Sequence, residues 1–347
     1  MKFRSYKHIL QFKFDAGTSR GVLKTKNSYV LEIWEEGNEA RKGIGEAGPL
    51  FGLSPEFQED LLQSFNNRIE KIFKDGFPRD KEAFQSWLKT NPIPEASFQM
   101  AFEMAYLNWL NFGKDIYFQN DFSNRKSQIP INGLIWMGEK DFMLKQIREK
   151  IDTGFTCLKM KIGAINFQDE ISILEYIRKE FSSEFLKIRV DANGAFNPKS
   201  ALQKLEEISK YDVHSIEQPI MAGQIKEMAE LCKSTPLPIA LDEELIGIRE
   251  FSAKNNLINE IKPQYLIFKP SLLGGFVQTN EWIELAENKD IPWWITSALE
   301  SNYGLNAIAQ FAAEYENDLE QGLGTGSLYH NNFDSDLRID SGYIKLI

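Results

Sequence analysis

Cysteine and histidine are scarce in this sequence of 347 residues, which has two cysteines and three histidines. The cysteines, Cys157 and Cys232, cannot build a disulfide framework or a thiolate metal cluster, and this favours a reducing cytoplasm as the compartment. The histidines at positions 8, 214 and 330 share no motif. A catalytic triad or a zinc site based on histidine is therefore disfavoured.

Long apolar runs, a glycine-rich phosphate loop and an excess of positive charge are also missing. No stretch approaches the roughly 18 apolar residues that span a bilayer, and the basic start lacks the apolar run of a signal peptide. The 50 acidic and 40 basic residues give a net charge of −10, which disfavours binding to nucleic acid or to an anionic membrane. No glycine-rich fingerprint follows a predicted strand, so dinucleotide binding is disfavoured too.

The first 125 residues predict a small α+β unit. Extended segments at 6–14 and 28–36 are joined by the glycine-containing loop 16–27, and a second loop covers 45–56. Two helical patterns follow, at 58–74 and 95–110, with apolar residues at steps of three and four. An antiparallel sheet with helices is the expected structure.

From about Ile129 a different rhythm begins, in which short apolar runs alternate with amphipathic helices. Seven strand-to-helix repeats and a weaker eighth strand indicate a parallel barrel, although a doubly wound open sheet would give a similar pattern. The last residues, 337–347, predict a hairpin. The apolar runs lie at 130–138, 157–163, 187–196, 213–220, 238–246, 265–275 and 292–301, with the eighth at 322–327.

Charged residues stand at the ends of five consecutive predicted strands. Strands of a parallel barrel are normally almost all apolar, and catalytic groups of barrel enzymes lie at the C-terminal strand ends. One such acid alone could be a helix cap, and one such lysine a surface side chain, but the repeated pattern indicates a site. The residues are Lys159 and Lys161 on the second strand, Asp191 and Asn193 on the third, Glu217 on the fourth, Asp242, Glu243 and Glu244 on the fifth, and Lys269 on the sixth.

The strand order gives the charged residues a geometry. Asp191, Glu217 and Asp242 end adjacent strands and form an oxygen-rich site that suits Mg²⁺. The second and sixth strands of an eight-stranded barrel lie opposite each other. We therefore expect Lys161 and Lys269 to face each other across the mouth, with the acids on the arc between them.

Strand alternation sets which side chains share a face. Lys159 and Lys161 are two residues apart, so both point to one side of the strand. By the same alternation, Glu243 is expected to face away from the lumen and to be structural.

This arrangement suits removal of a proton α to a carboxylate. The resulting enediolate carries two negative charges, and a metal that binds both oxygens stabilises that charge as it develops. A lysine acts as a base only when it is neutral, and nearby cationic groups lower its pKa. Lys159 beside Lys161, with a metal ion close by, supplies such a field, and a small-molecule carboxylate is the expected substrate.

Five strings resemble the enolase superfamily in its muconate-lactonizing subgroup: LKMKIG, RVDANGAF, SIEQP, LDEEL and IFKPSLLGG. The resemblance covers nearly the whole chain. It implies that Asp191, Glu217 and Asp242 hold Mg²⁺, with Mn²⁺ as a substitute, that Lys161 is the catalytic base, and that Lys269 is the opposing lysine. A lysine base beside Mg²⁺ is a known arrangement of enolase-type sites.

The same resemblance implies the architecture. The fold is expected to be α/β, a (β/α)7β modified TIM barrel over residues 126–330, with an N-terminal α+β capping domain and its lid loops over residues 1–125. The C-terminal tail, 331–347, is expected to pack on the capping domain.

Within that subgroup the chain is similar to the o-succinylbenzoate synthases, on the strings TSALESNYGL and INGLIWMG and on Arg20. This implies a lyase of menaquinone biosynthesis that dehydrates 2-succinyl-6-hydroxy-2,4-cyclohexadiene-1-carboxylate. Lys161 would take the α-proton and return it to the departing hydroxyl. Lys269 would stay cationic over the ring. Lys159, beside Lys161, is the third lysine assigned to the catalytic group.

Substrate contacts are expected from Arg20, Asn193, Ser297 and Ser301. Arg20 could equally be a solvated loop charge, and the two serines could cap the following helix. The loops at 17–27 and 48–54 are expected to close the mouth and exclude water.

Two other functions stay open. An N-acylamino-acid racemase or dipeptide epimerase would use the same lysines, but such epimerases usually carry a DxD motif on the last strand, where this chain reads GLGTGS. A non-catalytic barrel that only binds ligands is disfavoured, because idle buried charges cost stability.

Overall fold

The computed structural model describes residues 1–18 and 21–347. Its N-terminal part is an antiparallel sheet in the order β1-β2-β3. The strands are β1 (Lys2–Thr18), β2 (Gly21–Glu35) and β3 (Asn38–Ala47). The segment 16–27, which the sequence predicts as a loop, therefore belongs to the long β1–β2 hairpin on both sides of residues 19 and 20. Extended pairing explains the difference, because Ala16 to Thr18 pair with Leu23 to Gly21.

Three helices cover this sheet, α1 (Leu62–Asp75), α2 (Lys81–Thr90) and α3 (Ala96–Leu110). The short α2 is not among the helices predicted from the sequence. Almost every residue of α3 is buried. Its backbone touches β3 at Gly45, where a Cβ atom would lie only 1.9 Å from the carbonyl oxygen of Ala101.

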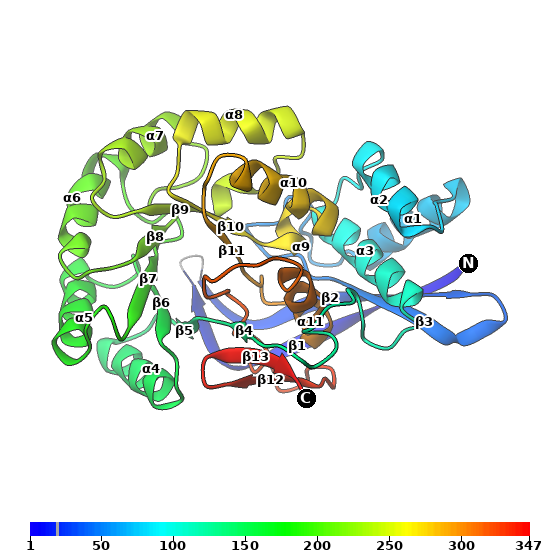
Figure 1. Cartoon of the computed structure of the whole chain (residues 1–347), viewed down its shortest axis with the longest axis horizontal. Coiled ribbons are helices and arrows are strands. Elements are labelled where there is room, and N and C mark those ends of the chain that lie inside the picture. Colours follow the sequence, from blue (N-terminus) through cyan, green and yellow to red (C-terminus); the bar gives the residue numbers. More distant parts are fainter. Residues whose placement is uncertain (19–20) are drawn as a thin grey trace.

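The second part is a curled sheet of seven parallel strands in the order β11-β10-β9-β8-β7-β6-β5. Figure 1 shows this sheet with helices α4 to α8 on its outside and the capping sheet at one side of it. The strands are β5 (Gly133–Ile135), β6 (Cys157–Lys161), β7 (Lys187–Asp191), β8 (Ser215–Glu217), β9 (Ile239–Leu241), β10 (Tyr265–Phe268) and β11 (Trp293–Ile295).

Helices alternate with these strands, as the sequence predicts. Their apolar faces pack on the outside of the sheet and form the main hydrophobic core of the molecule. The helices are α4 (Lys140–Asp152), α5 (Phe167–Glu180), α6 (Pro198–Ser209), α7 (Ile225–Ser234), α8 (Phe251–Ile261), α9 (Pro270–Leu273), α10 (Gly275–Glu287) and α11 (Asn302–Ala312), with a 3-10 turn, η1 (Glu243–Leu245), after β9.

The barrel closes through a very short eighth element. Gln321 forms a parallel bridge with Ile131, and Gly322 forms one with Thr296. The Gly322 amide donates to the carbonyl of Ile295 at 2.7 Å, and the Gln321 amide donates to the carbonyl of Pro130 at 2.8 Å. The eighth strand predicted at 322–327 is therefore reduced to two residues, which link β11 to the segment before β5.

The C-terminal residues form the predicted hairpin, β12 (Leu337–Asp340) and β13 (Tyr343–Leu346). β13 pairs with β4 (Ile129–Pro130), at the start of the barrel. The segment just before the hairpin reaches the capping sheet, because the Asn331 side chain donates to the carbonyl of Ile9 at 2.8 Å. The domain limits at residues 125 and 330 stay a prediction.

Candidate active site

The charged residues predicted from the sequence meet at one end of the barrel. In the parallel register Lys161 pairs with Asp191, and Asp191 pairs with Glu217. Asp242 follows β9 directly. All three carboxylate side chains are buried.

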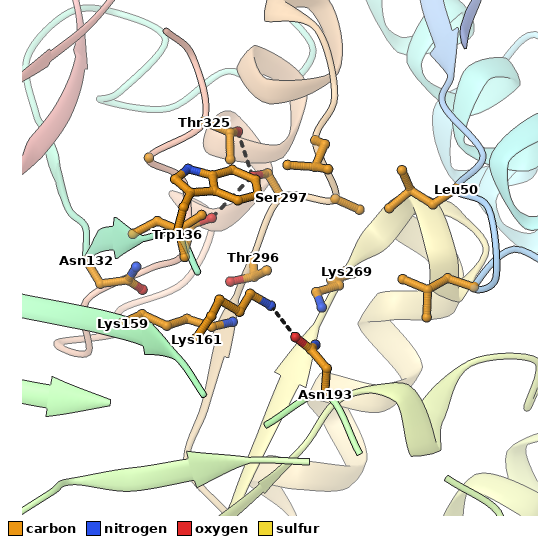
Figure 2. Close-up of a pocket in the computed structure, with 16 residues that line it drawn as sticks. Leu50, Asn132, Trp136, Lys159, Lys161, Asn193, Lys269, Thr296, Ser297 and Thr325 are labelled. Atoms are coloured by element: carbon orange, nitrogen blue, oxygen red, sulfur yellow. Dashed lines mark hydrogen bonds between the residues drawn. The ribbon is translucent and has the colours of Figure 1, made fainter. Parts of the chain in front are cut away.

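The two lysines approach the carboxylates from opposite sides, as predicted. Three strands, β7, β8 and β9, separate β6, which carries Lys161, from β10, which Lys269 follows. Figure 2 shows the side chains of Lys161 and Lys269 entering the same pocket from the two sides.

Ammonium groups and carboxylates are interleaved in this cluster. Asp191 Oδ2 lies 2.9 Å from Lys159 Nζ and 2.6 Å from Lys161 Nζ. Lys159 also pairs with Glu217. On the other side, Lys269 pairs with Asp242, and its Nζ lies 3.6 Å from Glu217 Oε1.

These contacts set the charge states. Burial by itself would raise the pKa of Asp191, but Lys159, Lys161 and Lys269 outweigh it and hold that pKa far below its usual range. Burial would lower the pKa of Lys269, but the surrounding carboxylates, Asp242 first, raise it well above its ordinary value. The pKa of Lys159 is likewise raised by Asp191 and Glu217 against its burial.

The donor set fits a divalent cation. Hard cations such as Mg²⁺ take oxygen ligands, and Asp191, Glu217 and Asp242 supply buried carboxylates from adjacent strands. Neither side-chain oxygen of Glu217 accepts a hydrogen bond within the described residues, although lysines lie at ion-pair distance. Within the part of the chain that the structure describes, no three acidic, histidine or cysteine groups are arranged to hold a metal. Lysine ammonium groups lie between the carboxylates, where a bound cation would compete with them.

Asn193 positions Lys161. Its backbone is left-handed, with φ of 44°, and its amide donates to Asp191 Oδ1 at 3.0 Å, a local turn for which asparagine is suited. Lys161 Nζ donates to Asn193 Oδ1 at 2.7 Å. The Asn193 side-chain amide donates to Glu243 Oε1 at 2.9 Å.

The expectation that Glu243 points away from the lumen is therefore wrong. Strand alternation no longer applies at this position, because the chain turns into η1 directly after Asp242. Glu243 contacts the site through Asn193 instead.

A cavity of about 100 Å³ opens above the lysines. Leu50 and Leu53, which follow β3, form part of its wall, so the predicted loop at 48–54 borders the cavity. Figure 2 shows Leu50 on the side of the pocket opposite Trp136. The other lining residues are Asn132, Leu134, Trp136, Lys159, Lys161, Asn193, Lys269, Thr296, Ser297, Ala298, Leu299, Gly322, Gly324 and Thr325.

The predicted substrate contacts have different outcomes. Arg20 lies outside the described residues. Ser297 borders the cavity, with its hydroxyl 2.7 Å from that of Thr325. Ser301 is not among the lining residues: it is buried, its hydroxyl accepts from the Tyr303 amide at 3.2 Å, and it caps α11. The assignment of Ser301 to the substrate is thus corrected in favour of its alternative as a helix cap.

Sequence reasoning missed several lining residues. Asn132 and Thr296 each carry a buried oxygen without a hydrogen-bond partner among the described residues. Polar residues within predicted apolar strands are the signal that could have found them. Trp136, within the string INGLIWMG, also lines the cavity. Trp293 and Trp294 are buried in hydrophobic clusters.

Comparison with known proteins agrees with this geometry. Residues 143–347 match the family described as "Enolase C-terminal domain-like". The chain belongs to the enolase superfamily. The resemblance found in the sequence and the α/β barrel fold are thereby confirmed.

Among superfamily relatives, an o-succinylbenzoate synthase of Desulfotalea psychrophila is 44% identical, over 96% of each chain. An L-amino acid-D/L-Glu epimerase of Francisella philomiragia is 31% identical, over 62% of this chain and 59% of its own length. The similarity to this synthase is thus higher and extends over nearly the whole chain.

Solved structures of superfamily members share the fold. The crystal structure of MenC from Desulfotalea psychrophila matches with a TM-score of 0.86 and 38% identity, covering 100% of this chain and 99% of that one. The L-Ala-D/L-Glu epimerase of Bacillus subtilis matches with a TM-score of 0.84 at 18% identity, covering 100% and 96%, a likeness of fold alone. No helix in the described part of the chain has the length and apolar character needed to cross a membrane.

Proposed function

We propose that this enolase-superfamily protein is an o-succinylbenzoate synthase, a lyase of menaquinone biosynthesis. It would convert 2-succinyl-6-hydroxy-2,4-cyclohexadiene-1-carboxylate to o-succinylbenzoate and water. The observation that carries the proposal is the convergence of Lys161 and Lys269 on one pocket, with three buried carboxylates between them. The 44% identity to a synthase over nearly the whole chain supports the choice of substrate.

Asp191, Glu217 and Asp242 are the residues that would hold Mg²⁺, with Mn²⁺ as a substitute. When bound, the cation supplies positive charge that stabilises the enediolate. The side chains around the cation would carry out the proton transfers, and Lys161 is the first of them.

Lys161 is placed to move the proton. Its ammonium group is held by Asp191 and Asn193, and its side chain borders the cavity. In the neutral form, Lys161 Nζ takes the proton from the carbon α to the carboxylate, and the C–H electron pair enters the enediolate. That electron pair then expels the hydroxyl group as the C–O bond breaks. Lys161 returns the proton to the departing oxygen, so the products are water and an aromatic ring.

Lys269 has a different task. The carboxylates around it raise its pKa, so it stays cationic at neutral pH. An ammonium group that stays protonated cannot act as the base, but it attracts the negative charge of the intermediate and the face of the ring. The two lysines are therefore assigned unequal roles in the dehydration.

The alternative function, racemisation of N-acylamino acids or epimerisation of dipeptides, would use the same two lysines on opposite faces of the α-carbon. This alternative is kept for the assay because an L-amino acid-D/L-Glu epimerase is 31% identical over 62% of this chain. Nothing in the GLGTGS segment of this chain supplies the acids that bind a dipeptide ammonium group.

One assay separates the two functions. The purified protein with Mg²⁺ receives the cyclohexadiene carboxylate in one reaction and an N-succinylamino acid in another. Formation of the aromatic product, followed by ultraviolet absorbance, is the expected result. Racemisation of the amino acid without any aromatic product would contradict the proposal and favour the racemase.

A further inference from the structure

One wall of the active-site cavity carries no charge. It is built by residues after β11 and by the short eighth element, and its polar groups are hydroxyls and backbone amides. The charged residues that line the cavity, Lys159, Lys161 and Lys269, are all cationic and stand on other strands. A substrate group that meets the uncharged wall therefore finds no anionic side chain there.

Gly322 contributes no side chain to this wall. A Cβ atom at position 322 would lie 1.6 Å from Thr296 Oγ1 and 2.8 Å from Thr296 Cβ. Neither distance is compatible with van der Waals contact. An aspartate at position 322 would thus collide with Thr296, and the wall cannot acquire an acid at this position while Thr296 is present.

The Thr296 hydroxyl has unused hydrogen-bonding capacity. Thr296 is 6% exposed, and its Oγ1 has no partner among the described residues. Figure 2 shows Thr296 near Lys161 and Lys269 among the residues that line the pocket. The neighbouring hydroxyls differ in this respect, because those of Ser297 and Thr325 lie 2.7 Å apart and bond to each other.

The backbone fixes Thr296 in place. Its amide donates to the carbonyl of Phe268 at 2.8 Å, next to Lys269, and it forms a bridge with Gly322. A buried hydroxyl with no partner costs free energy until a ligand satisfies it. A site built to bond a ligand group discriminates strongly against ligands that lack that group.

We infer that Thr296 is a specificity-determining residue of this pocket. Its hydroxyl donates a hydrogen bond to a carbonyl or carboxylate oxygen on the arm of the substrate, and its contact with Gly322 keeps an acid out of position 322. The substrate class is therefore a carboxylate with a second, neutral or anionic oxygen-bearing arm, and an ammonium-bearing arm is disfavoured. This inference rests on the proposed function in one respect, because only that function identifies the arm as a succinyl group.

The test compares a ligand that carries the arm, o-succinylbenzoate, with one that lacks it, benzoate. Binding of o-succinylbenzoate and of benzoate is measured by titration calorimetry with Mg²⁺ present, for the wild type, Thr296→Val and Thr296→Ser. Valine keeps the contact with Gly322 but removes the hydroxyl, whereas serine keeps the hydroxyl. We expect Thr296→Val to raise the Kd of o-succinylbenzoate about tenfold, which is the effect of one lost hydrogen bond. The Kd of benzoate should not change in this variant. Thr296→Ser should bind both ligands like the wild type.

Equal Kd values for o-succinylbenzoate in the wild type and Thr296→Val would overturn the inference, as would an equal loss of benzoate binding. Thr279→Val, a buried threonine on α10 away from the cavity, is the control for the loss of a hydroxyl. The proposed function is judged separately, by turnover of the cyclohexadiene substrate by the wild type. If the wild type turns over the cyclohexadiene substrate while Thr296→Val binds both ligands as tightly as the wild type does, the proposed function stands and only this inference is refuted.

Discussion

Lys161 and Asp191 occupy paired positions on neighbouring strands, and Lys161 Nζ lies 2.6 Å from Asp191 Oδ2. The register of β6 and β7 thus places the proposed base directly beside a proposed metal ligand. A cation bound at Asp191 would compete with the ammonium group of Lys161 for the same carboxylate. Under the proposed function, this contact would couple metal binding to the charge of Lys161.

Replacement of the base tests that arrangement. Lys161→Met removes the group that accepts the α-proton, and general-base catalysis contributes roughly 10² to 10⁴ in rate. We expect kcat to fall by about three orders of magnitude in the dehydration assay, with an unchanged circular dichroism spectrum. Lys145→Met, on the exposed face of α4, is the matched control and should retain full activity. Turnover by Lys161→Met close to that of the wild type would refute the assigned role.

Removal of divalent cations tests the carboxylate cluster. Dialysis against EDTA should abolish dehydration, because no other charge in the cluster can stabilise the enediolate as well as a dication. Added Mg²⁺ or Mn²⁺ should restore it. Asp242→Asn should need a metal concentration at least about tenfold higher for half-maximal activity, since a charged ligand is lost. Full activity in EDTA would show that the cluster works without a metal.

The stability of the protein should depend on pH through Glu103 of α3. This carboxyl is buried, and burial raises its pKa from 4.5 to about 7, although amides of Phe276 and Val277 donate to it. The folded state therefore holds a proton on Glu103 between pH 4.5 and 7 that the unfolded state has lost. The stabilisation from this proton is complete below pH 4.5 and disappears as the pH rises to about 7.

Glu103→Gln removes this titration. We expect the free energy of unfolding of the wild type, relative to that of the variant, to decrease by roughly 3 kcal/mol between pH 4.5 and 8. Urea unfolding at several pH values measures it. A difference between the two proteins that does not change with pH would contradict the raised pKa.

The contact between Gly322 and Thr296 should appear as energetic coupling. Gly322→Ala places a Cβ atom against Thr296 and should destabilise the fold by about 1–3 kcal/mol, the usual cost of overpacking. In the double variant with Thr296→Gly, this cost should largely disappear. A double-mutant cycle from urea unfolding, with Thr296→Gly alone as the reference, measures the coupling. Additive effects of the two substitutions would show that the residues do not obstruct each other.

Much of the site could be predicted from the sequence because charged residues are conspicuous within strands that should be apolar. Lys159, Lys161, Asp191, Glu217, Asp242 and Lys269 all lie in one cluster. Strand order alone placed the two lysines on opposite sides of the acids. Helix α2 and the two-residue closing element were harder to foresee, since short segments carry little periodicity.

The sequence by itself determined the family and the set of charged residues, because motifs and their spacing are local properties of the chain. The strand periodicity left a barrel and an open sheet both possible, and only the family resemblance favoured the barrel. The tertiary structure decided which of the remaining polar groups belong to the site. It brought Glu243 inward, because the chain leaves the strand at Asp242, and it removed Ser301, because a helix begins there. Thr296 and Gly322 are 26 positions apart in the sequence. Only the closure of the barrel brings them into contact, so their effect on the pocket could be seen only in three dimensions.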